Sequence, residues 1–415
     1  MGETLVQKIL AKKSGKKKVI PGEVIWVQPD LIAQYSITYF SGGSTLPDVR
    51  INPDRIAISP DHHFMPKGEN EAKSHATMRE MAKKYNIKNY HDIGQTGIQF
   101  QLLAEKGLVR PGMLIVHADS HVSTYGAFGT YAVGVGRDYV QAYRTGEVWL
   151  RVPQTLKINV TGKFPEGVTS RDLFEKILAD IGPGGAIGQA IQYTGPAVSA
   201  MSIESRMVLC NSVVFMSAET AIIEPDQKIL EYVKARTTGT FEALKGDASA
   251  EYTKVLNYDV SKLEPQVVMP TAVYHVKTIK EAAGIEIDQA FIGTCASGRM
   301  EDLRLAARIL KGRKIHQGTR LVIAPITPEI QRDAAREGLT DIFWEAGALV
   351  GPPSCGMCLQ GGYGWLLPGE RFISTGTLNL PGRHGSPEAQ TYLANPATVA
   401  ASAVSGKITD PREFL

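Results

Sequence analysis

Residues 289–303 read QAFIGTCASGRMEDL: a short apolar run, a turn that carries Cys295, and the start of a helix. The apolar run has the length of a buried strand, and the spacing of the apolar residues that follow predicts a helix over about 299–310. Glu301 and Asp302 lie in its first turn, where carboxylates interact favourably with the helix dipole. This order of strand, loop and helix is typical of α/β folds, which bind ligands at the carboxyl ends of their strands.

The same alternation continues through the 415 residues. Further predicted strands are 56–60, 113–116, 221–223 and 320–325, and further predicted helices are 69–85, 173–181 and 328–338. A chain of this length holds more than one hydrophobic core. We therefore predict an α/β protein of three domains, at 1–155, 156–265 and 266–415.

The four cysteines are unevenly placed, at Cys210, Cys295, Cys355 and Cys358. Three soft thiolate ligands in glycine-rich turns, Cys295 and the Cys355/Cys358 pair, suit an iron–sulfur cluster. A cubane held by three cysteines leaves one iron open, which is typical of a catalytic metal site. Two alternatives stay open, a structural zinc site completed by Cys210 or a histidine, and buried thiols without a metal.

A second group of polar residues follows the predicted strands 56–60 and 113–116. Its members are Asp61, His62, His63, His117, Asp119, Ser120 and His121. If the strand continues, residues 117, 119 and 121 point to one face. They would then form either a metal site of two imidazoles and a carboxylate, or an acid–base cluster in which Asp119 orients a histidine. The alternative is a set of hydrogen-bonded polar residues at strand ends.

Arg383 lies in a short turn, LPGRHG at residues 380–385. An arginine in this position could bind a carboxylate with two parallel hydrogen bonds, or it could lie on the surface.

Composition narrows the class of protein. Apolar residues make up 43% of the chain and charged residues 21%, and the net charge is +3. This balance argues against a nucleic-acid-binding surface, and the basic run at residues 12–18 is interpreted as a solvated segment. No apolar stretch reaches 18 residues, so we expect no membrane span. The N-terminus lacks an apolar signal core, which predicts a cytoplasmic protein.

Taken together, the motifs resemble the aconitase family, and within it the large subunits of 3-isopropylmalate dehydratase and homoaconitase. Asp61-His62 is similar to the family's Asp-His motif, and Asp119-Ser120-His121 to its Asp-Ser-His motif. The segments around Cys295 and around Cys355 and Cys358 are similar to the two cluster-binding segments. The resemblance continues through Gly382-Arg383 and the tail at 394–411, so it covers nearly the whole chain in the same order.

The resemblance implies three α/β domains around a central [4Fe-4S] cluster, bound by Cys295, Cys355 and Cys358. It implies reversible dehydration of a small hydroxy acid, with the open iron acting as a Lewis acid. The positions of Asp61, His62, Asp119, Ser120 and His121 are catalytic or orienting in the family, and that of Arg383 binds a substrate carboxylate. The family's swivelling domain has no counterpart here. We therefore expect a separate small subunit that supplies the base serine and further arginines.

Three departures from the family pattern concern the site. A site histidine is replaced by Phe100, a carboxylate by Phe215, and a substrate arginine by Leu378. Losing the arginine removes a clamp for carboxylate, and an unpaired substrate carboxylate there would cost several kcal/mol. We therefore expect a substrate other than citrate or isopropylmalate, with one carboxylate fewer or with an apolar group.

Two other functions are weighed against the hydro-lyase. One is a metallohydrolase that uses His117, Asp119 and His121, with the cysteines holding structural zinc. The other is an RNA-binding regulator, active when the cluster is lost. The absence of a basic stripe in the sequence counts against RNA binding.

Overall fold

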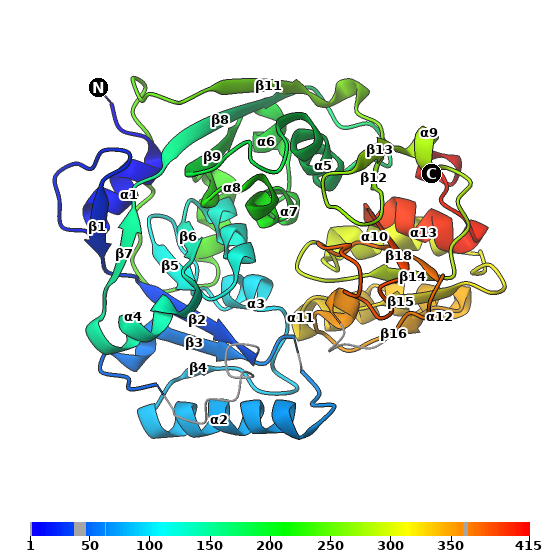
Figure 1. The fold of residues 1–415 in the computed structure, drawn as a ribbon, viewed down its shortest axis with the longest axis horizontal. Helices are drawn as coiled ribbons and strands as arrows, with labels where there is room; N and C mark the ends of the chain where they lie inside the picture. The colour runs from blue at the N-terminus through cyan, green and yellow to red at the C-terminus, as the bar shows by residue number, and fades with distance from the viewer. Residues whose placement is uncertain (1, 37–46, 63, 360–363) are drawn as a thin grey trace.

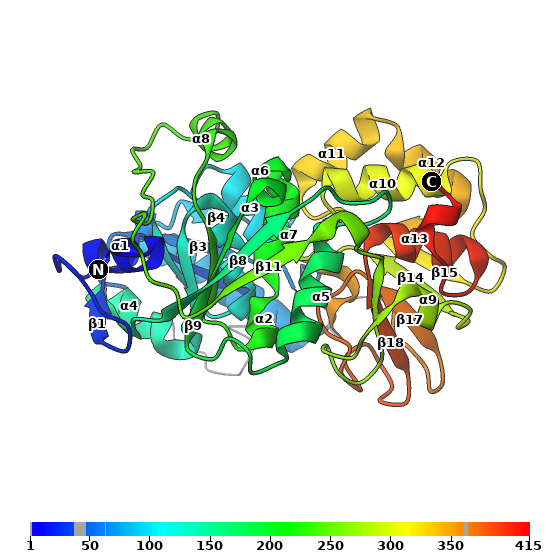
Figure 2. The same ribbon diagram turned by 90° about the horizontal axis from the view of Figure 1, so that it is seen from above.

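The computed structural model describes residues 2–36, 47–62, 64–359 and 364–415 of the chain. Three larger β-sheets take their strands from separate stretches of sequence, 31–134, 154–259 and 266–394. Figure 1 shows the third sheet and its helices, in yellow-green to red, beside the other two. The view from above in Figure 2 shows the same division. The α/β fold with several sheets is therefore confirmed.

The first sheet is parallel throughout. Its strand order is β4 (Asn89–Tyr90), β3 (Ile56–Ser59), β2 (Leu31–Tyr35), β5 (Leu114–His117) and β6 (Tyr131–Gly134). The helices of this region are α1 (Leu5–Lys13), α2 (Glu69–Tyr85), α3 (Gln99–Glu105) and α4 (Tyr139–Thr145). A separate antiparallel pair joins β1 (Val24–Val27) to β7 (Val148–Arg151). The predicted helix 69–85 is confirmed, and it ends at Asn86, which adopts the left-handed conformation common after helices.

The second sheet is also parallel. Its order is β10 (Thr220–Ile223), β9 (Gln189–Thr194), β8 (Gln154–Thr161) and β11 (Val255–Asp259). Its helices are α5 (Ser170–Ile181), α6 (Pro196–Ala200), α7 (Ile203–Asn211) and α8 (Gln227–Lys234). The start of α5 is fixed by a capping box between Thr169 and Asp172, which satisfies backbone donors that the helix leaves free.

The third sheet has a parallel centre and an antiparallel edge. Its order is β13 (Val276–Thr278), β12 (Gln266–Val268), β18 (Gln390–Ala394), β17 (Arg371–Ser374), β14 (Gln289–Ile292), β15 (Arg320–Ile323) and β16 (Leu349–Val350). The helices are α9 (Ile279–Ala282), α10 (Met300–Leu310), α11 (Pro328–Arg336), α12 (Leu339–Ala346) and α13 (Pro396–Ser405). The predicted helices at 299–310 and 328–338 are thus confirmed as α10 and α11.

One hydrophobic core joins the three sheets. It runs from Ile115 in the first sheet through Ile191 in the second to Ile292 in the third, all fully buried. Closely packed interiors resist deformation. The described strand ends are therefore held at fixed positions relative to one another.

The expectation of a strand through residues 117–121 is wrong. Strand β5 ends at His117, and residues Ser120–Phe128 form the 3₁₀ helix η3. The cause is local, because the Asp119 carboxylate accepts a hydrogen bond of 2.6 Å from the backbone N–H of His121. Such side-chain bonds to nearby backbone favour turns and helix starts over strands.

In the described part of the chain, no helix is both long enough and apolar enough to cross a membrane.

Candidate functional site

Two sheet edges meet at the candidate site. Strands β3 and β5 of the first sheet and β14, β16 and β17 of the third run into loops that carry the predicted site residues. A backbone hydrogen bond of 3.2 Å from Cys355 N–H to the carbonyl of Asp61 joins the two edges directly. The residues predicted from separate motifs therefore come together at the carboxyl ends of parallel strands, where α/β folds bind ligands.

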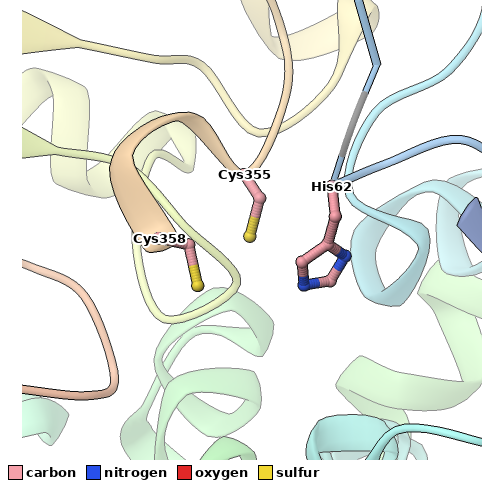
Figure 3. A group of neighbouring side chains, drawn as sticks. All are labelled: His62, Cys355 and Cys358. Atoms are coloured by element: carbon pink, nitrogen blue, oxygen red, sulfur yellow. The ribbon is translucent and has the colours of Figure 1, made fainter. Parts of the chain in front are cut away.

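A sulfur–imidazole group lies where the edges meet. The ligand atoms of His62, Cys355 and Cys358 all lie within 4.8 Å of one another, and all three residues are buried. Figure 3 shows both thiols and one ring nitrogen of His62 turned toward a common space. The backbone around Gly356 forms a short 3₁₀ turn, which presents Cys355 and Cys358 side by side.

Cys295 enters the site from a strained turn. The preceding residue, Thr294, has a φ of 73°, a left-handed conformation that is costly for a β-branched residue. Two hydrogen bonds of the Thr294 hydroxyl hold the turn, one donated to the carbonyl of Thr375 and one accepted from Ala296 N–H. Burial, followed by the charge of Cys358, raises the pKa of the Cys295 thiol. Cys295 and Cys358 are therefore electrostatic neighbours.

Arg383 is part of this group and does not lie on the open surface. Its Nε donates to the carbonyl of Cys358 at 2.7 Å, and its Nη2 lies 3.5 Å from the Cys358 sulfur. The hydrogen bond from Cys355, together with the charges of Arg383 and His62, holds the pKa of Cys358 well below its usual range, although burial opposes this. These neighbours therefore favour the thiolate form of Cys358, the form that binds metals.

Two aspartate–histidine pairs lie near the sulfurs, since His62 interacts electrostatically with Cys358 and Asp119 with Cys295. His62 Nδ1 lies 2.8 Å from Asp61 Oδ1, and His121 Nδ1 lies 3.1 Å from Asp119 Oδ1. Burial raises the pKa of Asp119, but the hydrogen bond and charge of His121 outweigh it, so that the pKa falls well below its usual value. The buried Nε2 of His121 has no hydrogen-bond partner among the described residues. It is therefore a free donor or acceptor beside the sulfur group.

His117 does not belong with these pairs. Its Nε2 lies 2.6 Å from Gln99 Oε1, and its Nδ1 accepts the backbone N–H of Asp119 at 2.8 Å. Burial lowers the pKa of His117 to about 4, so the ring is neutral. Because both nitrogens are engaged, the metal site of His117, Asp119 and His121 expected for a metallohydrolase does not form. The described residues therefore give that alternative no support.

Among the residues that the structure describes, the other candidates from the sequence are not members of the sulfur–imidazole group. Ser120 begins η3 and is exposed. His63 lies outside the described residues. The thiol of Cys210, in α7, is not in the metal-ligand group, and burial raises its pKa. A zinc site completed by Cys210 therefore has no support among the described residues.

Aromatic rings line one side of the site. Phe215 lies edge-on to His121, with ring centroids 5.7 Å apart. Phe100 packs against His117 at 5.4 Å and Tyr125 at 5.9 Å. The two phenylalanines therefore contact different histidines, and Phe215 is the one beside the free Nε2 of His121.

Sequence reasoning missed Tyr35, the last residue of β2. Its ring lies 5.1 Å from that of His117 and 4.9 Å from that of His62. Burial, then the charge of Asp119, to which it is hydrogen-bonded, raises the pKa of Tyr35. Tyr35 could have been found from its position, because it ends a strand that lies between β3 and β5, and ligands bind at such strand ends.

Asn211 and Arg299 were missed as well. Asn211 Oδ1 lies 3.7 Å from the Cys295 sulfur, and its Nδ2 donates to Thr124 at 2.8 Å. Arg299 is fully buried and donates to the carbonyl of Cys295 at 3.1 Å. Both hold the Cys295 loop, Arg299 from four residues further on and Asn211 from a distant part of the chain. Their sequence motifs gave no sign of these contacts.

Comparisons with known proteins agree with this arrangement. A model of the aconitase family (aconitate hydratase) matches residues 51–286 and 272–406. The 3-isopropylmalate dehydratase large subunit of Heliobacterium modesticaldum is 42% identical over 420 residues, which cover 100% of both chains. Large subunit 1 of 3-isopropylmalate dehydratase from Pyrococcus furiosus is 43% identical, over 100% of this chain and 99% of its own. The crystal structure of Thermococcus kodakaraensis aconitase X in its holo-form is similar in fold alone, at 12% identity, 90% and 89% coverage and a TM-score of 0.52.

Proposed function

The chain belongs to the aconitase family, and we propose that it is the cluster-binding large subunit of a hydro-lyase that dehydrates a hydroxy acid reversibly. The observation that carries the proposal is the buried sulfur–imidazole group of His62, Cys355 and Cys358 beside two aspartate–histidine pairs. Thiolates suit iron–sulfur clusters, and oriented histidines suit proton transfer.

The donor set fits a [4Fe-4S] cluster. Cys295, Cys355 and Cys358 are the proposed ligands, and all three are buried. The cationic Arg383 is hydrogen-bonded to Cys358. Burial lowers the pKa of His62, but the charge and hydrogen bond of Asp61 outweigh burial and raise this pKa to about 9. These positive charges balance the negative charge of thiolate ligands. When bound, the cluster would supply a Lewis acid at an iron that no cysteine holds.

His121 is the proposed proton carrier for the leaving hydroxyl. Asp119 accepts the hydrogen bond of Nδ1, which fixes the ring and leaves Nε2 for the substrate. In dehydration, the C–O bond breaks with its electron pair on oxygen, and Nε2 gives that oxygen a proton to form water. A proton leaves the adjacent carbon to a base, and its electron pair forms the C=C bond. The hydration direction reverses each transfer.

Asp61 and His62 are proposed to orient the site. Asp61 Oδ2 accepts the backbone N–H of Gln99 at 3.3 Å, while Oδ1 holds His62. Ser120 is proposed to take part through its place in the Asp-Ser-His motif. Arg383 uses Nε and Nη2 for Cys358, and its Nη1 has no partner among the described residues. We propose that Nη1 binds a substrate carboxylate.

The substrate is proposed to differ from isopropylmalate. Phe215 places an apolar edge against His121, and Leu378 is half-buried on the loop after β17. A buried carboxylate facing leucine and phenylalanine would lack a partner. The proposed substrate is therefore a hydroxy acid with one carboxylate fewer, or with an apolar group at this position.

A small subunit is proposed as the partner. The relatives from Heliobacterium and Pyrococcus are large subunits by name. The partner would close the site and supply the base serine and further arginines. The domain division at 1–155, 156–265 and 266–415 and a cytoplasmic location are retained as proposals.

The test is anaerobic purification, alone and with the product of the neighbouring gene. We expect about four iron and four sulfide per chain, and visible absorbance typical of iron–sulfur proteins. The complex is then assayed with a panel of 2-hydroxy acids by the ultraviolet absorbance of the alkene product. Zinc without iron in anaerobic material would overturn the proposal.

A further inference from the structure

A cavity of about 590 Å³ lies between the second and third sheets. It is bounded by the segment from the end of β8 to the start of α5, by α6 and α7, and by α10 across from them. The cysteine ligands, the aspartate–histidine pairs and Arg383 are not among its lining residues. Its size is within the usual range of small-molecule sites. It therefore lies outside the candidate active site and adjoins it at Ala296, the residue after Cys295.

Most of the cavity wall is apolar. Phe164, Met201, Val208, Leu305 and Pro396 contribute to it. Such a wall favours a hydrocarbon group, because moving apolar surface out of water is favourable.

Arg171 is the polar anchor of this wall. Only 5% of the residue is exposed. Its Nη1 and Nη2 donate to the carbonyls of Thr375 and Gly376 at 2.7 and 2.6 Å. Its Nε is buried and has no hydrogen-bond partner in the described part of the chain. The guanidinium is thus held in place with one donor unused, and an unused buried donor costs free energy unless a ligand satisfies it.

The charge of Arg171 is only partly balanced. Glu175 lies 3.3 Å away. Burial raises the pKa of Glu175 to about 7, although Arg171 lowers it, so a large share of this carboxyl is protonated at neutral pH. Arginine stays charged throughout. Glu175 therefore offsets the positive charge of Arg171 only in part.

The other charged groups around the cavity are already engaged. Glu301 accepts hydrogen bonds from the hydroxyls of Ser202 and Ser205. Asp302 accepts the backbone N–H of Arg299.

Two arginines of α10 have acidic partners, Glu337 for Arg304 and Glu166 for Arg308. Lys163 is exposed and has no ion pair given among the described residues. In the described part of the chain, the donors that remain unpartnered at the cavity therefore belong to two cationic side chains, Arg171 and Lys163, and they favour a ligand with an anionic acceptor.

We propose that this cavity binds a small monocarboxylate with an apolar chain. A small shift of the Arg171 side chain opens Nε, which is buried in this structure, to one carboxylate oxygen. Lys163 adds attraction at the exposed side, and the chain packs against Phe164, Met201 and Leu305. The proposal does not depend on the hydro-lyase function, because binding is measured without turnover.

The probe is hexanoate, titrated into the full-length chain by isothermal titration calorimetry, with hexylamine and hexan-1-ol as comparison ligands. We expect hexanoate to bind at least about tenfold more tightly than either, since only it carries the anion. Ala200→Trp, a substitution of an exposed lining residue on α6, should abolish the binding. Ala235→Trp, at an exposed site after α8 and outside the cavity lining, is the matched control and should bind normally.

Charge is tested by Lys163→Glu, which should weaken hexanoate binding about threefold to tenfold, while Lys234→Glu on α8 should leave it unchanged. Arg171→Lys keeps the charge but loses Nε, and it should weaken binding at least tenfold, with its melting temperature measured in parallel.

Arg383→Gln separates the cavity from the candidate active site, and it should bind hexanoate as the unaltered chain does. Loss of binding in Arg383→Gln with full binding in Ala200→Trp would overturn the proposal. Equal affinity for hexylamine and hexanoate would overturn it too.

Discussion

The two edges that form the site are stabilised in different ways. On the first sheet, each functional side chain has a partner of its own: Asp61 holds His62, Asp119 holds His121, and Gln99 holds His117. On the third sheet, buried thiols face one another, and burial raises the pKa of Cys295 while its neighbours lower that of Cys358.

The histidine edge is therefore complete within the chain, whereas the cysteine edge brings together groups that repel one another once ionised. From this difference we expect the histidine edge to keep its geometry without a cofactor. We expect the cysteine edge to depend on one.

The largest expected effect is that of Cys355→Ser. Removing one of three proposed ligands should reduce bound iron and turnover by at least about 100-fold, since a hydroxyl is a poor replacement for a thiolate. Iron analysis and visible absorbance check this. Cys210→Ala is the matched control, because that thiol is also buried but lies outside the sulfur group. A Cys355→Ser protein that kept its iron would contradict the expectation that the cysteine edge holds the cluster.

The next effect concerns the histidine edge. His121→Ala should lower kcat about 10²- to 10⁴-fold, the usual contribution of a positioned acid–base group, with iron content unchanged. His117→Ala also removes an imidazole, but one whose nitrogens are both engaged in structure. It should lower the melting temperature more than His121→Ala does. Iron loss on His121→Ala would show that the two edges are not independent.

A smaller effect is expected for substrate choice. Leu378→Arg should raise activity on dicarboxylate or tricarboxylate substrates about tenfold, because it adds a cation that can pair with the extra carboxylate. Steady-state kinetics on a substrate panel measure this. Leu380→Arg, at a position that is 48% exposed on the same loop, is the control and should change little. An unchanged preference in Leu378→Arg would remove the support for an altered substrate.

The smallest effect concerns a polar connection between the edges. Glu105 accepts hydrogen bonds from Gln101 at 3.0 Å and Thr327 at 2.9 Å, and Gln101 in turn accepts one from Arg299. Burial raises the pKa of Glu105 to about 7, above its value of about 4.3 in an unfolded chain. The folded state then binds the proton more tightly. Stability should therefore fall as pH rises between these two values, and the loss should be complete above pH 7.

Glu105→Gln should flatten this part of the stability profile. The unaltered chain should lose melting temperature between pH 5 and pH 8, and the variant should lose about 2–4 °C less over the same range. Calorimetric melting at both pH values measures the difference. Parallel profiles for the two proteins would show that Glu105 does not titrate in this range.

Much of the fold was predictable because it depends on local pattern. The helix at 69–85 and the strands that precede Asp61 and Cys295 follow from apolar periodicity and caps. The strand expected through residues 117–121 failed because one aspartate side chain bonded the backbone two residues on, a contact that periodicity does not report.

The sequence predicted most residues of the candidate site, but it did not predict how each of them is hydrogen-bonded. Cysteine spacing and the aspartate–histidine motifs named most of the group that the structure brings together. Tyr35, Asn211 and Arg299 act through residues distant in sequence, such as Asn211 on Cys295 across 84 positions. The choice between His117 and His121 also needed the position of Gln99, because the two histidines have similar sequence settings but opposite hydrogen bonding.

The left-handed Thr294 has a consequence for how this loop tolerates change. Glycine would adopt the same backbone angle without steric cost, yet it would lack the hydroxyl that ties Thr375 and Ala296 together. Relaxing the turn would thus release the sulfur next to it. Glycine at position 294 would make the backbone angle easy to adopt, whereas threonine holds the turn through its hydroxyl. This chain has threonine, and so it has the more rigid turn.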